Sequence, residues 1–489
     1  MISSNTRLCK MVTCVAAVNN VLRSLKMIVC SVILLYIKKK KTKKKHMSAT
    51  SNEFFVGIKP IKYNPQASVD DLLVFKQYNQ DEIILGKPMH EWLRFAVCYW
   101  HTFRGIGADM FGASTFDRPW DQSGNEMLIA KDRLRAAFEF FTKLGVKYFT
   151  FHDRDIAPEG ETIEQTEKNL DEVIQLAKEL QKQTGIKCLW GTANLFANPR
   201  YMNGAATNPD AHVFAYAAAQ VKKAMEVTHE LGGENYVFWG GREGYMSLLN
   251  TDVRKELDHL AAFLRMAVEH KKKIGFKGQL LIEPKPKEPT KHQYDYDAQT
   301  VMGFLNYYGL NKDFKLNIEP NHTTMAGHAY EHDVEMCSRY GMLGSIDSNT
   351  GDSSLGWDTD QFPMNLRDCA FVMKTVIAQG GLAPGGLNFD CKVRRESTNL
   401  QDMFIAHIGA MDCFALALRK MARLFDDKKY GILVQQRYAS YNETDIGKKI
   451  EAGVATFEEL HAFIKKNGEP AKTSGEQEKF EVIFNRYLD

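Results

Sequence analysis

The chain has 489 residues, of which 44% are hydrophobic and 25% charged, and its formal net charge is +3. This composition is ordinary for a globular protein, and the length allows a large buried core without disulfides. The charge is uneven, because residues 1–46 hold eleven Lys or Arg and no acid. The remainder has 52 of the 63 basic residues and all 60 acidic ones, a net charge of −8. An acidic body argues against binding to nucleic acid.

The nine cysteines are scattered along the chain and form no Cys-x-x-Cys pair. An odd number without metal-binding spacing argues against a disulfide framework and against a zinc ribbon. We therefore expect them to be small buried hydrophobic side chains of a protein in a reducing, cytoplasmic compartment.

The N-terminal segment differs in composition from the rest. Apolar residues 27–37 are followed by lysines at 38–41 and 43–45. A stretch of eleven residues is too short to span a bilayer, and a signal peptide has its positive region before the apolar one. Three interpretations remain: an element whose lysines contact anionic lipid, a targeting segment, or upstream sequence read in frame before a start at Met47. We favour the last, and expect membrane contact only if the mature protein keeps this extension.

From about residue 92, short apolar runs alternate with amphipathic helical stretches. The runs that predict strands are 93–98, 146–151, 186–192, 235–239, 279–282, 314–318, 343–346 and 386–389. The helices predicted between them include 130–144, 163–184, 211–231, 253–274 and 298–308. This alternation predicts a parallel sheet, and eight such units close most economically into a (β/α)8 TIM barrel. An open doubly wound sheet is the alternative, but no Gly-x-Gly-x-x-Gly turn follows a first strand.

A long tail follows the eighth predicted strand. Residues 402–425 have the apolar spacing of a helix, and the rest is polar with a few aromatics. We divide the chain into a non-catalytic extension over 1–46, a catalytic barrel over 47–395 and a C-terminal part over 396–489. The last part is expected to hold the final barrel helix and a mainly helical extension that contacts another subunit.

Ionisable residues follow five of the predicted strands, at the end where TIM barrels carry their chemistry. They are His152, Asp153, Asp155, Glu283, Lys285, Glu319, His322, Asp347 and Asp390, and the segment between the last two strands adds Asp358 and Asp360. One acid at a strand end is usually a solvated loop residue or a helix cap. Convergence of five strand ends on one rim is hard to explain in that way.

Six of the carboxylates, those of Glu283, Glu319, Asp347, Asp358, Asp360 and Asp390, would raise one another's pKa if they met without a counter-charge. Two divalent cations and Lys285 would bring the charge of the group to about −1. Oxygen ligands with one imidazole, that of His322, and no thiolate suit Mg²⁺, Mn²⁺ or Co²⁺ better than structural zinc. Asp358 and Asp360 would point the same way if their loop is extended.

The motifs at these positions resemble those of xylose isomerases, in particular the longer class II group. They are Phe-His-Asp-Arg-Asp at 151–155, Tyr-Val-Phe-Trp-Gly-Gly-Arg-Glu-Gly-Tyr at 236–245, Ile-Glu-Pro-Lys-Pro at 282–286, Ala-Gly-His at 326–328 and Gly-Trp-Asp-Thr-Asp-Gln-Phe-Pro at 356–363. The resemblance runs from about residue 53 to the C-terminus. It departs at Pro320, where a small residue is expected, and at Arg-Gly-Ile over 104–106, which replaces a more aromatic stretch and bears on pocket shape.

The resemblance implies two metal sites per subunit in a homotetramer, with Mg²⁺ the expected ion and Mn²⁺ or Co²⁺ as alternatives. The first site would be held by Glu283, Glu319, Asp347 and Asp390, and the second by Glu319, His322, Asp358 and Asp360. His152, oriented by Asp155, would open the sugar ring, and Lys285 would bind the carbonyl oxygen of the sugar. Trp190 and Phe111, the latter from a neighbouring subunit, would form the apolar wall.

The expected reaction interconverts D-xylose and D-xylulose, and D-glucose with D-fructose is a further substrate pair. A histidine with a carboxylate partner suits the proton transfer of ring opening near neutral pH. Because the rim carboxylates are committed to metal, a metal-assisted 1,2-hydride shift is favoured over an enediol route with a free carboxylate base.

Two other functions are compatible with a barrel that carries charged strand ends. An apurinic endonuclease would use more histidine ligands and a basic surface, which the single histidine and the acidic body argue against. A sugar-binding barrel without activity would not need His152 and Lys285 beside the ligands.

Overall fold

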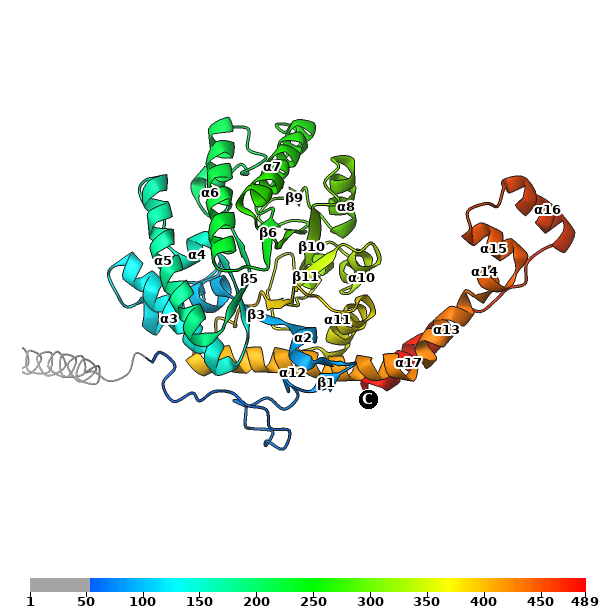
Figure 1. Ribbon diagram of the computed structural model, residues 1–489, viewed down its shortest axis with the longest axis horizontal. Coiled ribbons are helices and arrows are strands. Elements are labelled where there is room, and N and C mark those ends of the chain that lie inside the picture. The colour runs from blue at the N-terminus through cyan, green and yellow to red at the C-terminus, as the bar shows by residue number, and fades with distance from the viewer. Residues whose placement is uncertain (1–52) are drawn as a thin grey trace, which may run out of the picture. The chain divides into compact units, whose positions relative to one another are not determined.

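Eight short strands of the computed structural model close into the predicted (β/α)8 barrel (Figure 1). They are β3 (Phe95–Cys98), β4 (Tyr148–His152), β5 (Lys187–Thr192), β6 (Asn235–Trp239), β8 (Gln279–Glu283), β10 (Phe314–Ile318), β11 (Leu343–Asp347) and β12 (Leu387–Phe389). Every neighbouring pair is parallel, and β12 pairs with β3 to complete the ring. The structure describes residues 53–489. The predicted extension over 1–46 lies outside the described residues.

The strands are buried on both faces, which is why continuous apolar runs marked them in the sequence. Every residue of β3, β4 and β11 is buried. A parallel strand in a barrel faces the packed interior on one side and a layer of helices on the other, so both sides need apolar residues. Side chains that fill the interior are Ala96, Tyr148, Leu189, Trp190, Val237 and Leu281.

The barrel helices follow their strands in the expected order. They are α3 (Glu126–Leu144), α5 (Ile163–Thr184), α6 (Ala211–Glu230), α7 (Val253–Ile274), α8 (Ala298–Tyr307), α10 (His332–Arg339), α11 (Leu366–Gln379) and α12 (Leu400–Asp427). Of these, α3, α5, α7 and α11 each begin at a side chain that accepts a backbone N–H and end at a glycine with positive φ. Such caps satisfy the free backbone groups at helix ends.

Shorter elements lie between these units. They are β1 (Ile83–Ile84), β2 (Lys87–Pro88), α2 (Met89–Leu93), α4 (Asp153–Ile156), β7 (Gly244–Tyr245), β9 (His292–Gln293), α9 (Pro320–Met325), a π-helical turn (Trp100–Arg104) and two 3-10 turns (Pro119–Asp121 and Pro199–Tyr201). The π-helical turn, α4 and α9 come directly after or one residue after a barrel strand. They therefore position side chains at the mouth of the barrel.

The helix α12 is the longest in the described part of the chain. Among the described residues, it is the one helix whose length and hydropathy would allow it to cross a membrane. Half of its most apolar 18-residue window is buried within this chain. Its buried residues include Phe404, Met411, Phe414 and Leu418, which belong to the main core.

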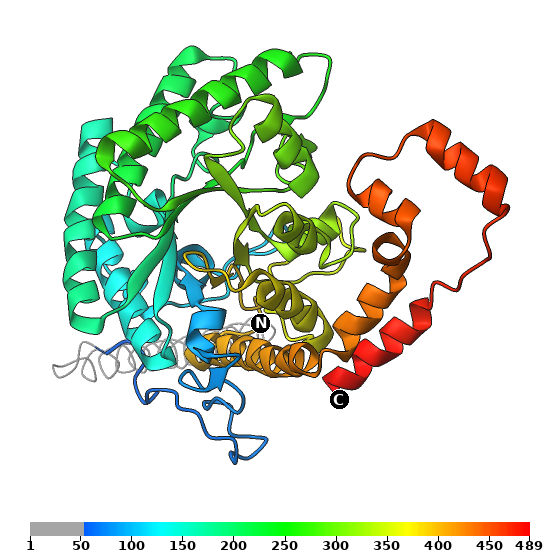
Figure 2. The ribbon, with the colours of Figure 1, turned by 45° about the vertical axis from the view of Figure 1, so that its right-hand side comes forward.

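The remaining C-terminal residues form the predicted helical extension. Its helices are α13 (Lys429–Arg437), α14 (Ala439–Glu443), α15 (Asp445–Glu451), α16 (Phe457–Asn467) and α17 (Gln477–Leu488). Figures 1 and 2 show α13 to α16 leading away from the barrel and α17 returning toward it. The ring of Phe484 in α17 stacks on Phe371 of α11 at 4.7 Å. By contrast, Gly447 is the one buried residue in helices α13 to α16. We call α13 to α17 the C-terminal arm.

Candidate active site

The carboxyl ends of the barrel strands surround a cavity of about 300 Å³. That volume is at the lower end of the range for small-molecule sites. The predicted site residues that line it are His152, Trp190, Glu283, Lys285, Glu319, His322, Asp358, Asp360 and Asp390. Asp347 is fully buried and joins the carboxylates of this group from β11.

The structure brings together both predicted ligand sets. Carboxylate oxygens of Glu283, Glu319, Asp347 and Asp390 all lie within 4.8 Å of one another, as do those of Glu319, Asp358 and Asp360. Glu319 belongs to both groups, so its carboxylate lies between them. Glu283 and Asp347 are the last residues of their strands, and Glu319 is the N-cap of α9.

The first helical position of α9 is Pro320, the residue noted as a departure in the sequence. A proline fits there, because that position has no intrahelical hydrogen bond to lose. The turn of α9 then carries His322 back over Glu319, and His322 Nε2 lies 3.1 Å from Glu319 Oε1. The departure therefore leaves the ligand geometry intact.

His322 has the hydrogen-bond pattern of a metal-binding imidazole. Its Nδ1 lies 3.0 Å from the carbonyl oxygen of Pro284 and its Nε2 lies 2.9 Å from Asp358 Oδ2. Donation from Nδ1 to a carbonyl leaves the Nε2 lone pair for a cation. Burial, together with the positive charge of Lys285, lowers the pKa of His322, which favours that neutral form.

The ligand set of Glu283, Glu319, Asp347 and Asp390 consists of carboxylates alone and contains no cationic side chain. Burial raises the pKa values of Glu283, Glu319 and Asp390 well above the usual range, and repulsion among the carboxylates adds to the effect. Burial also raises the pKa of Asp347 to about 6.

Asp347 supplies a direct test of whether these residues fit a metal. Its Oδ1 accepts a hydrogen bond from Asn388 at 2.9 Å, whereas its buried Oδ2 has no hydrogen-bond partner. Buried carboxylate oxygens are normally paired. A divalent cation would provide the partner, and the set of oxygen ligands with one imidazole fits Mg²⁺, Mn²⁺ or Co²⁺.

Three asparagines that the sequence analysis missed orient the carboxylates. Asn317 Nδ2 donates to Glu283 at 2.9 Å, Asn388 donates to Asp347, and Asn349 Nδ2 donates to Glu319 at 2.5 Å. Asn317 and Asn388 are buried polar residues inside the strands β10 and β12. A polar residue in a buried run was the signal available for both.

His152 and Asp155 meet as predicted from their spacing. His152 ends β4, Asp155 lies in α4, and His152 Nδ1 is 2.6 Å from Asp155 Oδ2. Arg104 Nε lies 3.7 Å from the other oxygen of Asp155. Burial opposes ionisation of Asp155, but His152 and Arg104 outweigh it and hold the pKa of this carboxyl below its usual value.

The side chain of Lys285 lies in the cavity beside two carboxylates and an aromatic ring. Its Nζ lies 3.0 Å from Asp358 Oδ2, 3.2 Å from Glu288 Oε2 and 5.3 Å from the centre of the Trp239 ring. Burial opposes its charge, but Asp358 and other carboxylates raise the pKa of Lys285 above its ordinary value. The side chain is therefore a buried cation at neutral pH.

The loop that carries Asp358 and Asp360 is not extended, contrary to the sequence-based expectation. Asp360 has φ of +44°, in the left-handed region, and its backbone N–H donates to Asp358 Oδ1 at 3.3 Å. Their carboxylates nevertheless converge on Glu319. A strained residue at a ligand position is typical of a site held in shape by its surroundings.

The two predicted wall residues have different positions. Trp190 is buried, and its ring lies 5.4 Å from that of Trp100. Phe111 is 88% exposed and is not among the residues that line this cavity. Its assignment to a neighbouring subunit stays a prediction.

Several other cavity residues were missed in the sequence. Trp100 Nε1 donates to Asp390 Oδ1 at 2.8 Å, and His101 Nε2 lies 3.2 Å from the same oxygen and 3.3 Å from Asp360 Oδ2. Lys392 Nζ lies 2.8 Å from Asp360 Oδ2. Trp100 and His101 follow the first barrel strand closely, so the strand-end rule applied to the other strands would have found them.

Comparison with known proteins identifies the family. Residues 138–352 match the family described as xylose isomerase-like TIM barrel, and residues 434–488 match the XylA2 C-terminal domain. The chain is 57% identical over 432 residues to a xylose isomerase of Arabidopsis thaliana, covering 88% of this chain and 90% of that protein. The chain belongs to the xylose isomerase family. This membership confirms the resemblance and argues against the endonuclease alternative.

Other members of the family are as similar. A xylose isomerase of Hordeum vulgare is 55% identical over 436 residues, covering 89% of this chain and 91% of that protein. One from Caldanaerobacter subterraneus subsp. yonseiensis is 56% identical over 436 residues, covering 89% of this chain and 99% of that protein. The similarity therefore spans both the barrel and much of the C-terminal arm.

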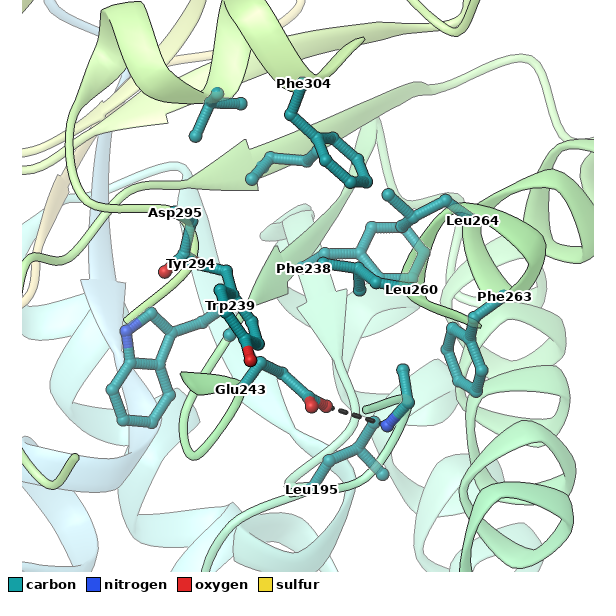
Figure 3. A pocket seen from close by; sticks show the side chains of 14 residues that line it. Leu195, Phe238, Trp239, Glu243, Leu260, Phe263, Leu264, Tyr294, Asp295 and Phe304 are labelled. Atoms are coloured by element: carbon teal, nitrogen blue, oxygen red, sulfur yellow. Dashed lines mark hydrogen bonds between the residues drawn. The ribbon is translucent and has the colours of Figure 1, made fainter. Parts of the chain in front are cut away.

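A second cavity lies among β6, β8, α7 and α8 (Figure 3). Trp239 lines both this cavity and the active-site cavity. The lining of the second cavity is mainly apolar, including Phe238, Leu264 and Phe304. The carboxylate of Glu243 is already used, because it accepts backbone N–H groups at 205–207. The wall of this cavity also supports the active site, because the backbone N–H of Lys285 donates to the backbone carbonyl oxygen of Asp295 at 3.0 Å.

Proposed function

We propose that this member of the xylose isomerase family interconverts D-xylose and D-xylulose and requires two divalent metal ions per subunit. The observation that carries the proposal is the convergence of two carboxylate groups, joined at Glu319, on the cavity that also holds the His152–Asp155 pair. The names of the relatives support the choice of sugar.

The residues that would hold the cations are those of the two ligand sets. They are Glu283, Glu319, Asp347 and Asp390 for one ion, and Glu319, His322, Asp358 and Asp360 for the other. Such cations supply positive charge that binds sugar oxygens and stabilises negative charge formed on them. Mg²⁺ is the proposed ion, with Mn²⁺ or Co²⁺ as alternatives, because oxygen ligands predominate.

His152 is the residue proposed to open the sugar ring. Its Nδ1 is held by Asp155, which leaves Nε2 as the nitrogen that can exchange a proton with the anomeric hydroxyl. The carboxylate partner fixes the orientation of the ring and stabilises its positive charge after it takes the proton. The cavity is therefore supplied with a base that does not depend on the ligand carboxylates.

Transfer of hydrogen between the two sugar carbons is proposed to be a hydride shift. Among the described residues that line the cavity, Glu288 is the one carboxylate outside the ligand sets, and its Oε2 lies 3.2 Å from Lys285 Nζ. An uncommitted carboxylate base is thus missing from this lining. Lys285 would donate to the sugar oxygen that becomes negative, and Trp190 with Trp100 would exclude water.

The test follows formation of D-xylulose from D-xylose by chelator-treated protein before and after addition of Mg²⁺, Mn²⁺ or Co²⁺. Activity should disappear with the chelator and return with an ion. The same conversion in D₂O distinguishes the two routes of hydrogen transfer. A hydride shift leaves the product without deuterium on carbon, whereas an enediol route incorporates it. Folded protein that is inactive on D-xylose with every ion would overturn the choice of substrate.

We also propose that the C-terminal arm contacts another subunit of a homotetramer. Few residues of helices α13 to α16 are buried within this chain. Large apolar side chains of this segment are therefore exposed, among them Phe457 at 89% and Tyr438 at 55%. Phe111 and Met110, each 88% exposed, form a second apolar surface on the loop after the first strand. Removal of residues 428–489 is expected to lower the molar mass measured by light scattering to that of smaller assemblies. An unchanged tetramer would overturn the role of the arm.

A further inference from the structure

A second group of potential metal ligands lies outside the active-site cavity, where the N-terminal ends of α8 and α10 meet. His332 and Asp333 are the first two residues of α10, and His328 lies four residues before it. One imidazole nitrogen from each histidine and one carboxylate oxygen of Asp333 all lie within 4.8 Å of one another. Asp297, the N-cap of α8, places its Oδ2 at 3.1 Å from His328 Nε2.

Asp333 indicates that this group lacks a partner. The residue is 3% exposed, and its Oδ2 accepts the backbone N–H of Ala298 at 3.2 Å. Its Oδ1 is buried and has no hydrogen-bond partner among the described residues. A buried carboxylate oxygen without a donor or a cation is destabilising, and each such atom in a native protein requires an explanation.

The arrangement of the two histidines favours binding of one metal cation between them over protonation of both rings. Their rings lie 22° from parallel with centres 4.4 Å apart. Two protonated imidazoles at this distance would repel each other. In the neutral form each ring has a nitrogen lone pair available to a metal. The His328 side chain is 30% exposed, so solvent reaches this edge of the group.

We propose that His328, His332 and Asp333 form a metal site, separate from the active site, that binds Zn²⁺, with Asp297 beside His328. A tetrahedral Zn²⁺ accepts two imidazoles and a carboxylate with water as the fourth ligand, whereas Mg²⁺ prefers oxygen ligands alone. The carboxylate of Asp297, 3.1 Å from His328 Nε2, would add a second negative charge beside the ion. The ion would join the N-terminal ends of α8 and α10 and would pair Asp333 Oδ1.

The experiment compares zinc binding by three full-length proteins saturated with Mg²⁺. They are the wild type, the double variant His328→Gln/His332→Gln, and the control His212→Gln, which removes an exposed histidine at the start of α6. Each is given three equivalents of Zn²⁺, dialysed against Mg²⁺ buffer and analysed for zinc by mass spectrometry. The wild type and the control should each retain one zinc ion per subunit more than the double variant. Zinc should also raise the Tm of the first two proteins more than that of the double variant.

Zinc that replaces Mg²⁺ in the active site would occur in all three proteins and cancels in this comparison. Equal zinc content in the three proteins would overturn the proposal. Anomalous diffraction of zinc-treated wild-type crystals provides a measurement that does not depend on the variant folding. A peak between His328 and His332 is expected, and peaks confined to the active site would overturn the proposal.

Discussion

The two sides of the active-site cavity differ in how their charges are balanced. On one side, the Asp155 carboxylate is paired with His152 at 2.6 Å and lies 3.7 Å from Arg104. On the other, Glu283 and Asp390 are buried among further carboxylates, and their pKa values are raised as a result. The chain thus completes the proton-transfer side itself. On the carboxylate side, Lys285 and Lys392 lie beside Asp358 and Asp360, but no lysine or arginine of the described residues pairs with Glu283 or Asp390, so this side still needs added positive charge.

The largest effect is expected from removing the carboxylate shared by both ligand sets. Glu319→Gln should lower kcat by roughly 1000-fold or more, because it weakens the binding of both ions and the stabilisation of charge on the sugar. Metal content and kcat are measured on the same preparation. Glu335→Gln, a change of an acid in α10 outside the ligand sets, provides the control. A Glu319→Gln protein with two bound ions and wild-type kcat would contradict the comparison.

A smaller loss should follow from a change on the proton-transfer side. His152→Asn is expected to lower kcat/KM by about 100- to 1000-fold, the usual contribution of a general base. Metal content should remain that of the wild type, because His152 is outside both ligand sets. If this variant loses metal, the two sides of the cavity are not independent.

The pH dependence of stability in the metal-free protein tests the carboxylate side alone. Folding raises the pKa values of Glu283, Glu319 and Asp390 and raises that of Asp347 to about 6, above the unfolded value near 4. A carboxyl group with a raised pKa stabilises the fold at low pH, and this contribution is lost as the pH rises through the folded pKa. The Tm of metal-free protein should therefore fall by a few degrees between pH 5 and 8.

Saturating Mg²⁺ is the control for that measurement, because bound cations compensate the ionised carboxylates. The fall in Tm should be absent or reversed when metal is present. A metal-free protein whose Tm is constant over this range would show that the carboxylates are already compensated.

The smallest expected effect concerns Arg104, one of the residues at 104–106 that depart from the family pattern. Its guanidinium lowers the pKa of Asp155 from a position that is 42% exposed. In Arg104→Gln, Asp155 would stabilise protonated His152 more strongly, so the acid limb of kcat/KM should move to higher pH by about 0.5 unit. Arg254→Gln, at an exposed site on α7, should leave the profile unchanged. A shift to lower pH would contradict this role.

The barrel and the ligand carboxylates were predictable because they depend on local patterns. Each strand is a short, mainly apolar and mostly buried run, and Glu283 and Asp347 are the last residues of β8 and β11. The same patterns do not predict the backbone conformation of the loops. The π-helical turn that brings His101 to Asp390, and the left-handed conformation of Asp360, arise from tertiary packing rather than from residue spacing. Phe111 is 88% exposed, and its place in the wall of a neighbouring subunit's site stays a prediction from the family resemblance.

Whether activity depends on two bound cations is measured by titrating Mn²⁺ into chelator-treated protein and following D-xylulose formation at each addition. We expect two ions per subunit in the wild type, activity that rises as they bind, and weakened binding in Glu319→Gln. Full activity before any ion is added, or equal binding by the wild type and Glu319→Gln, would contradict this expectation.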